Sequence, residues 1–162
     1  MPRIFKRPRM VVSRCIEFDP CRYNGDMIRS PIVAKLKEHV DFIPVCPQVE
    51  IGLGIPRPTL RIVRSGVTDH LIQPETGRDV SEDMNCFSEE FLDTLPVVEG
   101  FILKNKSPTS RIRDAKVYSS PGKSAPVGYA PGFFAGRSSA GFPSSRWKMK
   151  EGSGTYGYVI TS

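Results

Sequence analysis

The chain has 162 residues, which is enough for one domain with a sizeable hydrophobic core. Its formal net charge of +6 lies at the two ends, because residues 1–9 and residues 121–162 each carry a net charge of +4 and residues 10–120 carry −2. This distribution argues against a specific nucleic-acid partner, and no apolar run approaches the roughly 20 residues of a membrane span or the core of a signal peptide.

The first half of the chain predicts a strand, a helix and a second strand. Residues 9–15, "RMVVSRC", form a short continuous apolar run that is typical of a strand buried on both faces. Residues 30–40 predict a helix, with Ser30 as its N-cap and Pro31 in its first turn. Residues 41–46, "DFIPVC", predict a second buried strand that also ends in cysteine.

The second half continues this alternation. "LRIVRSG" and "DHLIQP" predict a small hairpin or an edge ribbon. Residues 79–95 predict a helix that begins with a capping box of Asp79 and Glu82, and residues 99–104 predict a third strand. We therefore expect a single α/β domain with three layers, in which a mostly parallel sheet carries helices on both faces.

Three separate stretches converge in this arrangement. Ligands of such sheets bind at the carboxyl ends of the strands. Cys15 and Cys46 are each the last residue of a predicted strand, and the loop from Lys104 to Arg111 begins where the third strand ends. The sequence therefore predicts one site at this edge of the sheet.

The cysteines leave two interpretations open. Cys15 and Cys46 are either small apolar side chains packed at strand ends or ligands of a metal or cluster, for which their wide spacing suits an iron–sulfur centre better than a zinc knuckle. Cys21 is either buried, a redox partner or a further ligand. Cys86 is expected in the core of the second helix. In the cytoplasm, where we expect this protein, such thiols stay reduced.

Polar residues near the predicted site offer other chemistry. Glu50 is either a base with a raised pKa, among apolar residues and glycines, or a solvated loop residue. Lys104 and Ser107 are the other polar groups that we expect near a substrate. Arg22 and Arg57 either grip an anionic or carbonyl-bearing ligand or form structural ion pairs.

Several motifs together resemble a known family. In order and spacing, "VVSRC…CRYNG", "FIPVCPQVEIGLGIPRP", "QPETGRDVSE" and "GFILKNKSPTSRIRDAKVY" are similar to the bacterial thiouracil desulfurases, an iron–sulfur family long catalogued as being of unknown function. The resemblance covers about residues 8–128. It implies an α/β domain that converts a thiolated uracil, a small nucleobase, to uracil.

The resemblance also implies a cofactor and its ligands. The family carries a [4Fe-4S] cluster held by three cysteines, with one iron left open to bind the sulfur of the substrate. Cys15 matches the first ligand and Cys46 the second, but Ser110 stands where the third cysteine is expected, and Gln48 stands where the family often has glutamate. Serine is a poor cluster ligand. Either Cys21 substitutes for it, or the chain is a non-catalytic α/β module that binds a small ligand without a cluster.

The two ends are expected to lie outside the domain. Residues 1–8 form a basic arm, residues 9–128 the desulfurase-like domain and residues 129–162 a low-complexity tail. Longer members of the family carry a second, helical domain after a short connector. The DNA that encodes "WKMKEG", read one base earlier, could encode such a connector. We therefore expect the tail either to be disordered or to be an out-of-frame translation that begins near Ala135, which sequencing of the locus would test.

Overall fold

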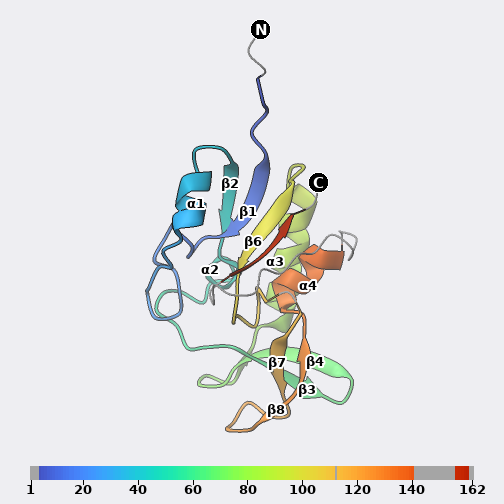
Figure 1. Ribbon diagram of the computed structural model, residues 1–162. Helices are drawn as coiled ribbons and strands as arrows, with labels where there is room; N and C mark the ends of the chain where they lie inside the picture. The colour runs from blue at the N-terminus through green and yellow to red at the C-terminus, as the bar shows by residue number, and fades with distance from the viewer. Residues whose placement is uncertain (1–3, 112, 141–155, 161–162) are drawn as a thin grey trace.

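The computed structural model describes residues 4–111, 113–140 and 156–160. Its first sheet is built around three parallel strands. β1 (Arg9–Ser13) lies between β2 (Asp41–Val45) and β6 (Gly100–Lys104), and β9 (Tyr156–Ile160) pairs antiparallel with β6. The three predicted strands are therefore present, in the order β2-β1-β6-β9 (Figure 1).

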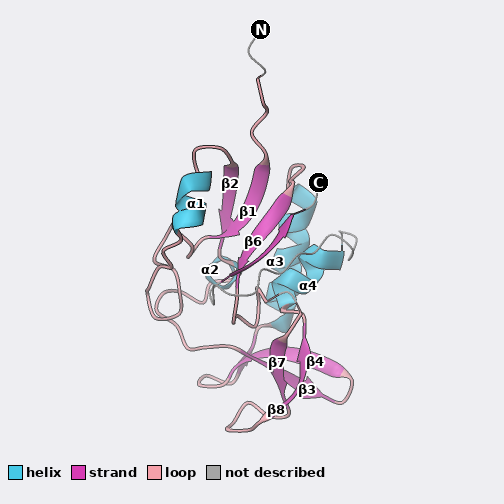
Figure 2. Ribbon diagram, in the orientation of Figure 1, coloured by secondary structure: helices cyan, strands magenta, loops and turns pink. Residues whose placement is uncertain are grey.

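Successive residues of the central strands enter two different cores. Val11 and Phe101 pack on the side of α3 (Ser81–Thr94) and α4 (Phe133–Ala140), whereas Val12 and Ile102 pack on the side of α1 (Pro31–Leu36). This two-sided burial is why the strands read as continuous apolar runs. Helices cover both faces of the sheet (Figure 2), which confirms the expected three-layer α/β fold.

The predicted helix starts are partly correct. Ser30 caps α1, since its hydroxyl accepts a hydrogen bond from the Val33 N–H at 3.3 Å, and Pro31 occupies the first turn. The expected capping box of the second helix does not form. The N-cap of α3 is Val80, which has no capping side chain, so Asp79 at the end of β5 (Arg78–Asp79) lies one residue too early. Its carboxylate accepts hydrogen bonds from the N–H and hydroxyl of Ser81.

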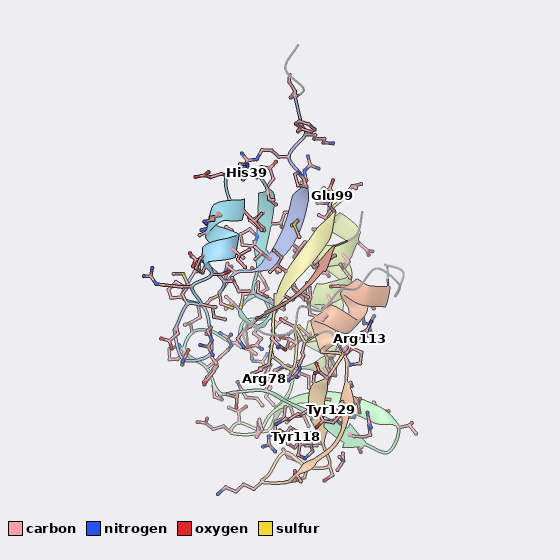
Figure 3. The ribbon with its side chains drawn as sticks, in the orientation of Figure 1. His39, Arg78, Glu99, Arg113, Tyr118 and Tyr129 are labelled. Atoms are coloured by element: carbon pink, nitrogen blue, oxygen red, sulfur yellow. The ribbon has the colours of Figure 1, made fainter. Side chains whose placement is uncertain are left out.

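A second sheet extends the molecule beyond the predicted hairpin. β3 (Arg61–Ser65) and β4 (Thr68–Gln73) form that hairpin. The strand β5 on one side, and β7 (Ala115–Tyr118) and β8 (Pro126–Ala130) on the other, enlarge it to five strands in the order β5-β4-β3-β7-β8. Only the β3–β7 pair is parallel among the pairs described in this sheet. Tyr118 and Tyr129 mark β7 and β8 in Figure 3, far from His39 and Glu99 at the other end of the molecule.

The ordered domain continues past residue 128. That boundary falls inside β8, and α4 follows it within the segment that was expected to be a tail. Phe134 and Ala135 are fully buried, and the Phe134 ring lies 5.7 Å from the Phe91 ring and 6.3 Å from the Phe87 ring, centroid to centroid. We predict a frame shift for the segment that begins near Ala135. Most of this segment lies outside the described residues, namely residues 141–155 and 161–162. The out-of-frame origin of the segment stays a prediction.

Within the described part of the chain, none of the helices combines the length and the apolar character that crossing a bilayer requires.

Candidate functional site

A cavity of about 470 Å³ opens at the carboxyl ends of β1, β2 and β6. The structure brings Cys15, Cys46 and the loop from Lys104 to Ser110 together in its walls. The other lining residues come from the loops after β1 and β2 and from the chain before β3: Ser13, Arg14, Arg22, Tyr23, Ile28, Val45, Pro47, Gln48, Arg57, Thr59 and Leu60.

Local structure sets the position of each cysteine. Cys15 lies two residues beyond the end of β1, and its carbonyl accepts a hydrogen bond from the Ile28 N–H at 2.7 Å. Cys46 is the N-cap residue of a short helix, α2 (Pro47–Glu50), which we had expected to be a loop. Proline directly after Cys46 favours this helix start, since it needs no N–H there.

Three thiols form a row beside the cavity. Cys15 and Cys46 are 6% and 8% exposed, and Cys21 is fully buried between them. The Cys21 thiol is within hydrogen-bonding reach of both neighbours, and the Cys46 thiol also points at the Cys21 carbonyl at 3.9 Å. Cys86 was expected in the core but is exposed, because α3 turns that residue away from its buried stripe.

The row of thiols has one preferred site for negative charge. The pKa of Cys15 is lowered because it accepts a hydrogen bond from Cys21 and lies near Lys104 and Arg22. The pKa of Cys21 is raised by that same hydrogen bond to Cys15. The pKa of Cys46 is raised by its hydrogen bond to Cys21 and by burial. Cys15 is therefore the thiol that ionises first.

Arg57 lies buried behind Cys46 and ties three loops together. Its Nε donates to the Gln48 side-chain oxygen at 2.8 Å, and its NH1 group donates to the carbonyls of Cys21 and Gly54 at 3.0 and 2.9 Å. Its NH2 group lies 3.9 Å from Cys46 Sγ. Gly54 adopts a φ of +77°, which a side chain at this position would strain.

Hydroxyl groups organise the loop that carries the third expected ligand position. The Ser107 hydroxyl receives the N–H groups of Thr109 and Ser110 at 3.3 and 3.4 Å, so Ser107 builds the turn. The Ser110 hydroxyl lies in the cavity wall, 3.4 Å from Thr109 Oγ1, which also accepts a hydrogen bond from the Gln48 amide at 3.2 Å.

The same loop is anchored to the start of α4. The N–H groups of Phe133, Phe134 and Ala135 donate to the carbonyls of Pro108 and Thr109 at 2.9 to 3.2 Å. Gly132 makes this approach feasible, because a Cβ there would lie 2.6 Å from the Thr109 carbonyl group. The site loop therefore supplies the backbone cap of α4.

An ion pair closes the loop on its other side. Arg111 donates to both carboxylate oxygens of Asp114, with Nε–Oδ1 and NH2–Oδ2 distances of 2.5 and 2.7 Å. These hydrogen bonds hold the pKa of Asp114 below its usual range. Arg111 thus pairs with Asp114 and is not among the residues that line the cavity, although it directly follows Ser110.

Two of the polar candidates lie in different surroundings. Glu50 does not line the cavity; its carboxylate pairs with Arg14 at 3.5 Å, which corresponds to the solvated alternative. Lys104 does line it, and its Nζ donates to the Asn105 carbonyl at 2.9 Å while its backbone N–H donates to the Ser13 hydroxyl at 2.8 Å. The pKa of Lys104 is lowered by burial and by nearby Arg22.

The three cysteine thiols are suitable ligands for an iron–sulfur cluster, whereas the Ser110 hydroxyl is not. Among residues 4–111, 113–140 and 156–160, no three His, Cys, Asp or Glu side chains are arranged to hold a single metal ion. Thiolates of a cluster bind separate irons and need not converge on one point. Cys15, Cys21 and Cys46 supply three soft donors beside the cavity, whereas the Ser110 hydroxyl is a hard donor already within reach of Thr109.

Sequence reasoning missed how Gln48, Thr109 and Arg57 are connected. The sequence marked Arg57 only as a cation that could grip a ligand, and Gln48 only as a residue that stands where the family often has glutamate. Thr109 carried no signal beyond its place in a Ser-Pro turn. Their hydrogen bonds join segments that are up to 61 residues apart in sequence, which no local pattern reports.

Comparisons with known proteins agree with this geometry. Residues 10–148 match the family model described as 2-thiouracil desulfurase. None of the curated proteins matches the chain. Among solved structures, the chain is similar to "[4Fe-4S]-dependent thiouracil desulfidase TudS", with a TM-score of 0.60 and 24% sequence identity over 83% of this chain and 87% of that one. At this identity the structural match supports the fold.

Proposed function

Because this chain belongs to the 2-thiouracil desulfurase family, we propose that it removes sulfur from a thiolated uracil bound in the cavity beside Cys15 and Cys46. The observation that carries the proposal is the pair of buried thiols in the cavity wall, Cys15 and Cys46, with the buried thiol of Cys21 behind them. The cavity volume of about 470 Å³ is within the range of small-molecule sites. The substrate class is a small thiolated nucleobase, with neither nucleic acid nor membrane as a partner.

Cys15, Cys46 and Cys21 are the residues that would hold the [4Fe-4S] cluster expected from the resemblance. When bound, the cluster supplies an iron with affinity for the sulfur of the substrate, which polarises the carbon–sulfur bond. Cys21 replaces the missing third thiol, because it is the remaining buried thiol of the described residues and lies in the same apolar cluster as Cys15 and Cys46. Buried free thiols also favour a reducing compartment, and we place the protein in the cytoplasm.

The remaining lining residues bind and orient the base. Lys104 lines the cavity, and its Nζ, which donates to the Asn105 carbonyl, can donate to a carbonyl of the pyrimidine as well. Ser110 and Thr109 present hydroxyl groups on the same side. The apolar part of the wall, formed by Val45, Leu60 and Ile28, excludes water from the sulfur of the substrate. Ser107 serves as the turn residue that positions these hydroxyls.

One observation favours a second function, a binding module without catalysis. The lining of the cavity contains no aspartate or glutamate among the described residues, and Gln48 occupies the position where the family often has a carboxylate. A water molecule in this cavity therefore lacks a carboxylate base. A chain that has lost the cluster would keep the cavity and bind the base without cleaving it.

Anaerobic reconstitution distinguishes the two functions. The chain is incubated with iron and sulfide, its bound iron and visible charge-transfer absorbance are measured, and sulfide release from 2-thiouracil is followed. A bound cluster and released sulfide are expected. The Ser110→Cys variant should retain at least as much cluster, and Cys86→Ser serves as the control because that thiol is exposed and outside the cavity. Absence of cluster and sulfide in both the unaltered chain and Ser110→Cys would refute the desulfurase proposal and leave the binding module.

A further inference from the structure

The guanidinium group of Arg57 is held in one orientation behind Cys46. Its Nε donates to the Gln48 oxygen, and its NH1 group donates to the carbonyls of Cys21 and Gly54. A guanidinium is planar and rigid, so these three hydrogen bonds also fix the direction of the remaining NH2 group. That group faces Cys46 Sγ at 3.9 Å and cannot turn to another partner while the three bonds hold.

The charge of Arg57 has no carboxylate partner in the part of the chain that the structure describes. Its acceptors are an amide oxygen, two backbone carbonyls and a sulfur. The carboxylates of Asp19 and Glu50 pair with Arg14 instead. Arg57 is only 8% exposed, so water compensates little of its charge. Because a buried cation without a counter-ion is costly, the arrangement is complete only when its surroundings supply a negative charge.

Cys46 supplies that negative charge when it holds a cluster. Cysteine binds iron as the thiolate, and Cys46 is one of the residues that would bind the cluster in the proposed function. The contact between Arg57 and the Cys46 sulfur then becomes a charge-assisted hydrogen bond, and the thiolate is the counter-ion of the guanidinium. Hydrogen bonds to the sulfurs and nearby charge are the features by which a protein tunes such a cluster.

We propose that Arg57 is a positioning residue that acts on the reaction through Cys46. By donating to the sulfur, it draws electron density away from the thiolate and leaves the irons more electron-poor. An electron-poor iron is a stronger acceptor for the sulfur of the substrate. The inference rests on the proposed function, because it concerns the cluster that the cysteines would hold. Arg57 contributes without touching the reacting atoms.

The reduction potential tests this role in the absence of substrate. The full chain is reconstituted anaerobically with iron and sulfide, its bound iron is measured, and it is titrated with dithionite while the visible absorbance is followed. Reduction adds an electron beside the negatively charged thiolates, and Arg57 stabilises that added charge. In Arg57→Gln the potential should therefore shift to more negative values. A merely structural role would admit water to the cluster, which favours the more highly charged reduced form and shifts the potential the other way.

Two further variants separate charge from geometry. Arg57→Lys keeps the charge but loses the rigid fork, so its potential should lie between those of Arg57→Gln and the unaltered chain. Arg64→Gln removes the same charge from β3, outside the cavity, and should leave the potential unchanged.

A second measurement needs no cluster. NMR of the arginine side-chain N–H groups is recorded on the iron-free chain, and the Arg57 signals are assigned by their loss in Arg57→Lys. Cys46→Ala should shift the signals of the Arg57 NH2 group, because the sulfur that this group faces is removed. Cys86→Ser, at an exposed thiol, should leave them in place.

The outcomes separate this inference from the proposed function. A potential that is unchanged or more positive in Arg57→Gln would overturn the inference, as would unshifted Arg57 signals in Cys46→Ala. If Arg57→Gln does not fold or takes up no iron, equal potentials of Arg57→Lys and the unaltered chain would overturn it. Expected potential shifts without sulfide release from 2-thiouracil would refute the proposed function alone. An unaltered chain that takes up no iron would refute both.

Discussion

The side chain of Gln48 is fixed at both ends, and one of its partners is Arg57, whose Nε lies 2.8 Å from the Gln48 oxygen. At the other end its amide nitrogen donates to Thr109 Oγ1 at 3.2 Å. One amide therefore connects the loop after β2, the loop before β3 and the loop after β6.

We predict that Thr109→Val destabilises the protein by about 1–3 kcal/mol, because the Gln48 amide loses its acceptor inside the protein. The free energy of unfolding is measured by urea denaturation. Thr68→Val, at an exposed position of β4, should change it by less than about 0.5 kcal/mol. Equal small effects of both substitutions would show that the Gln48–Thr109 bond does not support the site.

Cys21→Ser should abolish stable cluster binding while leaving the chain folded. The substitution keeps a small side chain in a fully buried position but removes the central soft donor of the row. Bound iron after anaerobic reconstitution and the melting temperature are measured together, with Cys86→Ser as the matched control. Full iron retention in Cys21→Ser would remove Cys21 from the ligand set.

Gly132→Ala should destabilise the protein by about 1–3 kcal/mol and displace the site loop. The added methyl group would lie 2.6 Å from the backbone of Thr109, and a backbone neighbour cannot rotate away. Gly122→Ala, whose methyl group meets no atom closer than 3.9 Å, is the control. Urea denaturation gives the stability, and an unchanged value for Gly132→Ala would contradict the packing of this loop on α4.

Phe134→Ala should cost about 3–5 kcal/mol, the usual range for a fully buried aromatic side chain. The ring packs on Phe87 and Phe91 of α3, so its loss separates the two helices. Val97→Ala, at a loop position that is 84% exposed, should stay within about 0.5 kcal/mol of the unaltered chain. A small effect at Phe134 would indicate that the segment after β8 does not belong to the core.

Asp114→Asn should make stability less dependent on pH. Hydrogen bonds from Arg111 lower the folded-state pKa of Asp114, so its stabilising contribution is present above the unfolded-state pKa of about 3.9 and is lost as the pH falls through the folded value. Because both side chains are partly exposed, the contribution near pH 7 is at most about 1 kcal/mol. Denaturation curves of the two proteins should converge toward low pH; Glu75→Gln, at an exposed turn, is the control.

The elements that the sequence predicted are those with a strong local signal. β1, β2 and β6 read as continuous apolar runs because both of their faces are buried, and Ser30 followed by Pro31 marks the start of α1. Their order also placed Cys15 and Cys46 at one edge of the sheet, since parallel strands of an α/β fold end on the same side.

α4 could not be predicted, because its stability comes from contacts that are distant in sequence. Its residues include glycine and serine, which are weak helix formers. The helix is stabilised by the carbonyls of the site loop and by the packing of Phe134. The second sheet was underestimated for a similar reason, since the short strand β7 joins β3 only after a long connection and β8 then pairs with β7.

The attachment of the site loop to α4 makes ligand binding observable at a distance. Any ligand that orders Pro108 and Thr109 also steadies the acceptors of the Phe133, Phe134 and Ala135 amides. Exchange of these amide protons with solvent should therefore slow when the cavity is filled. Three backbone amides that do not touch the cavity would then report its occupancy.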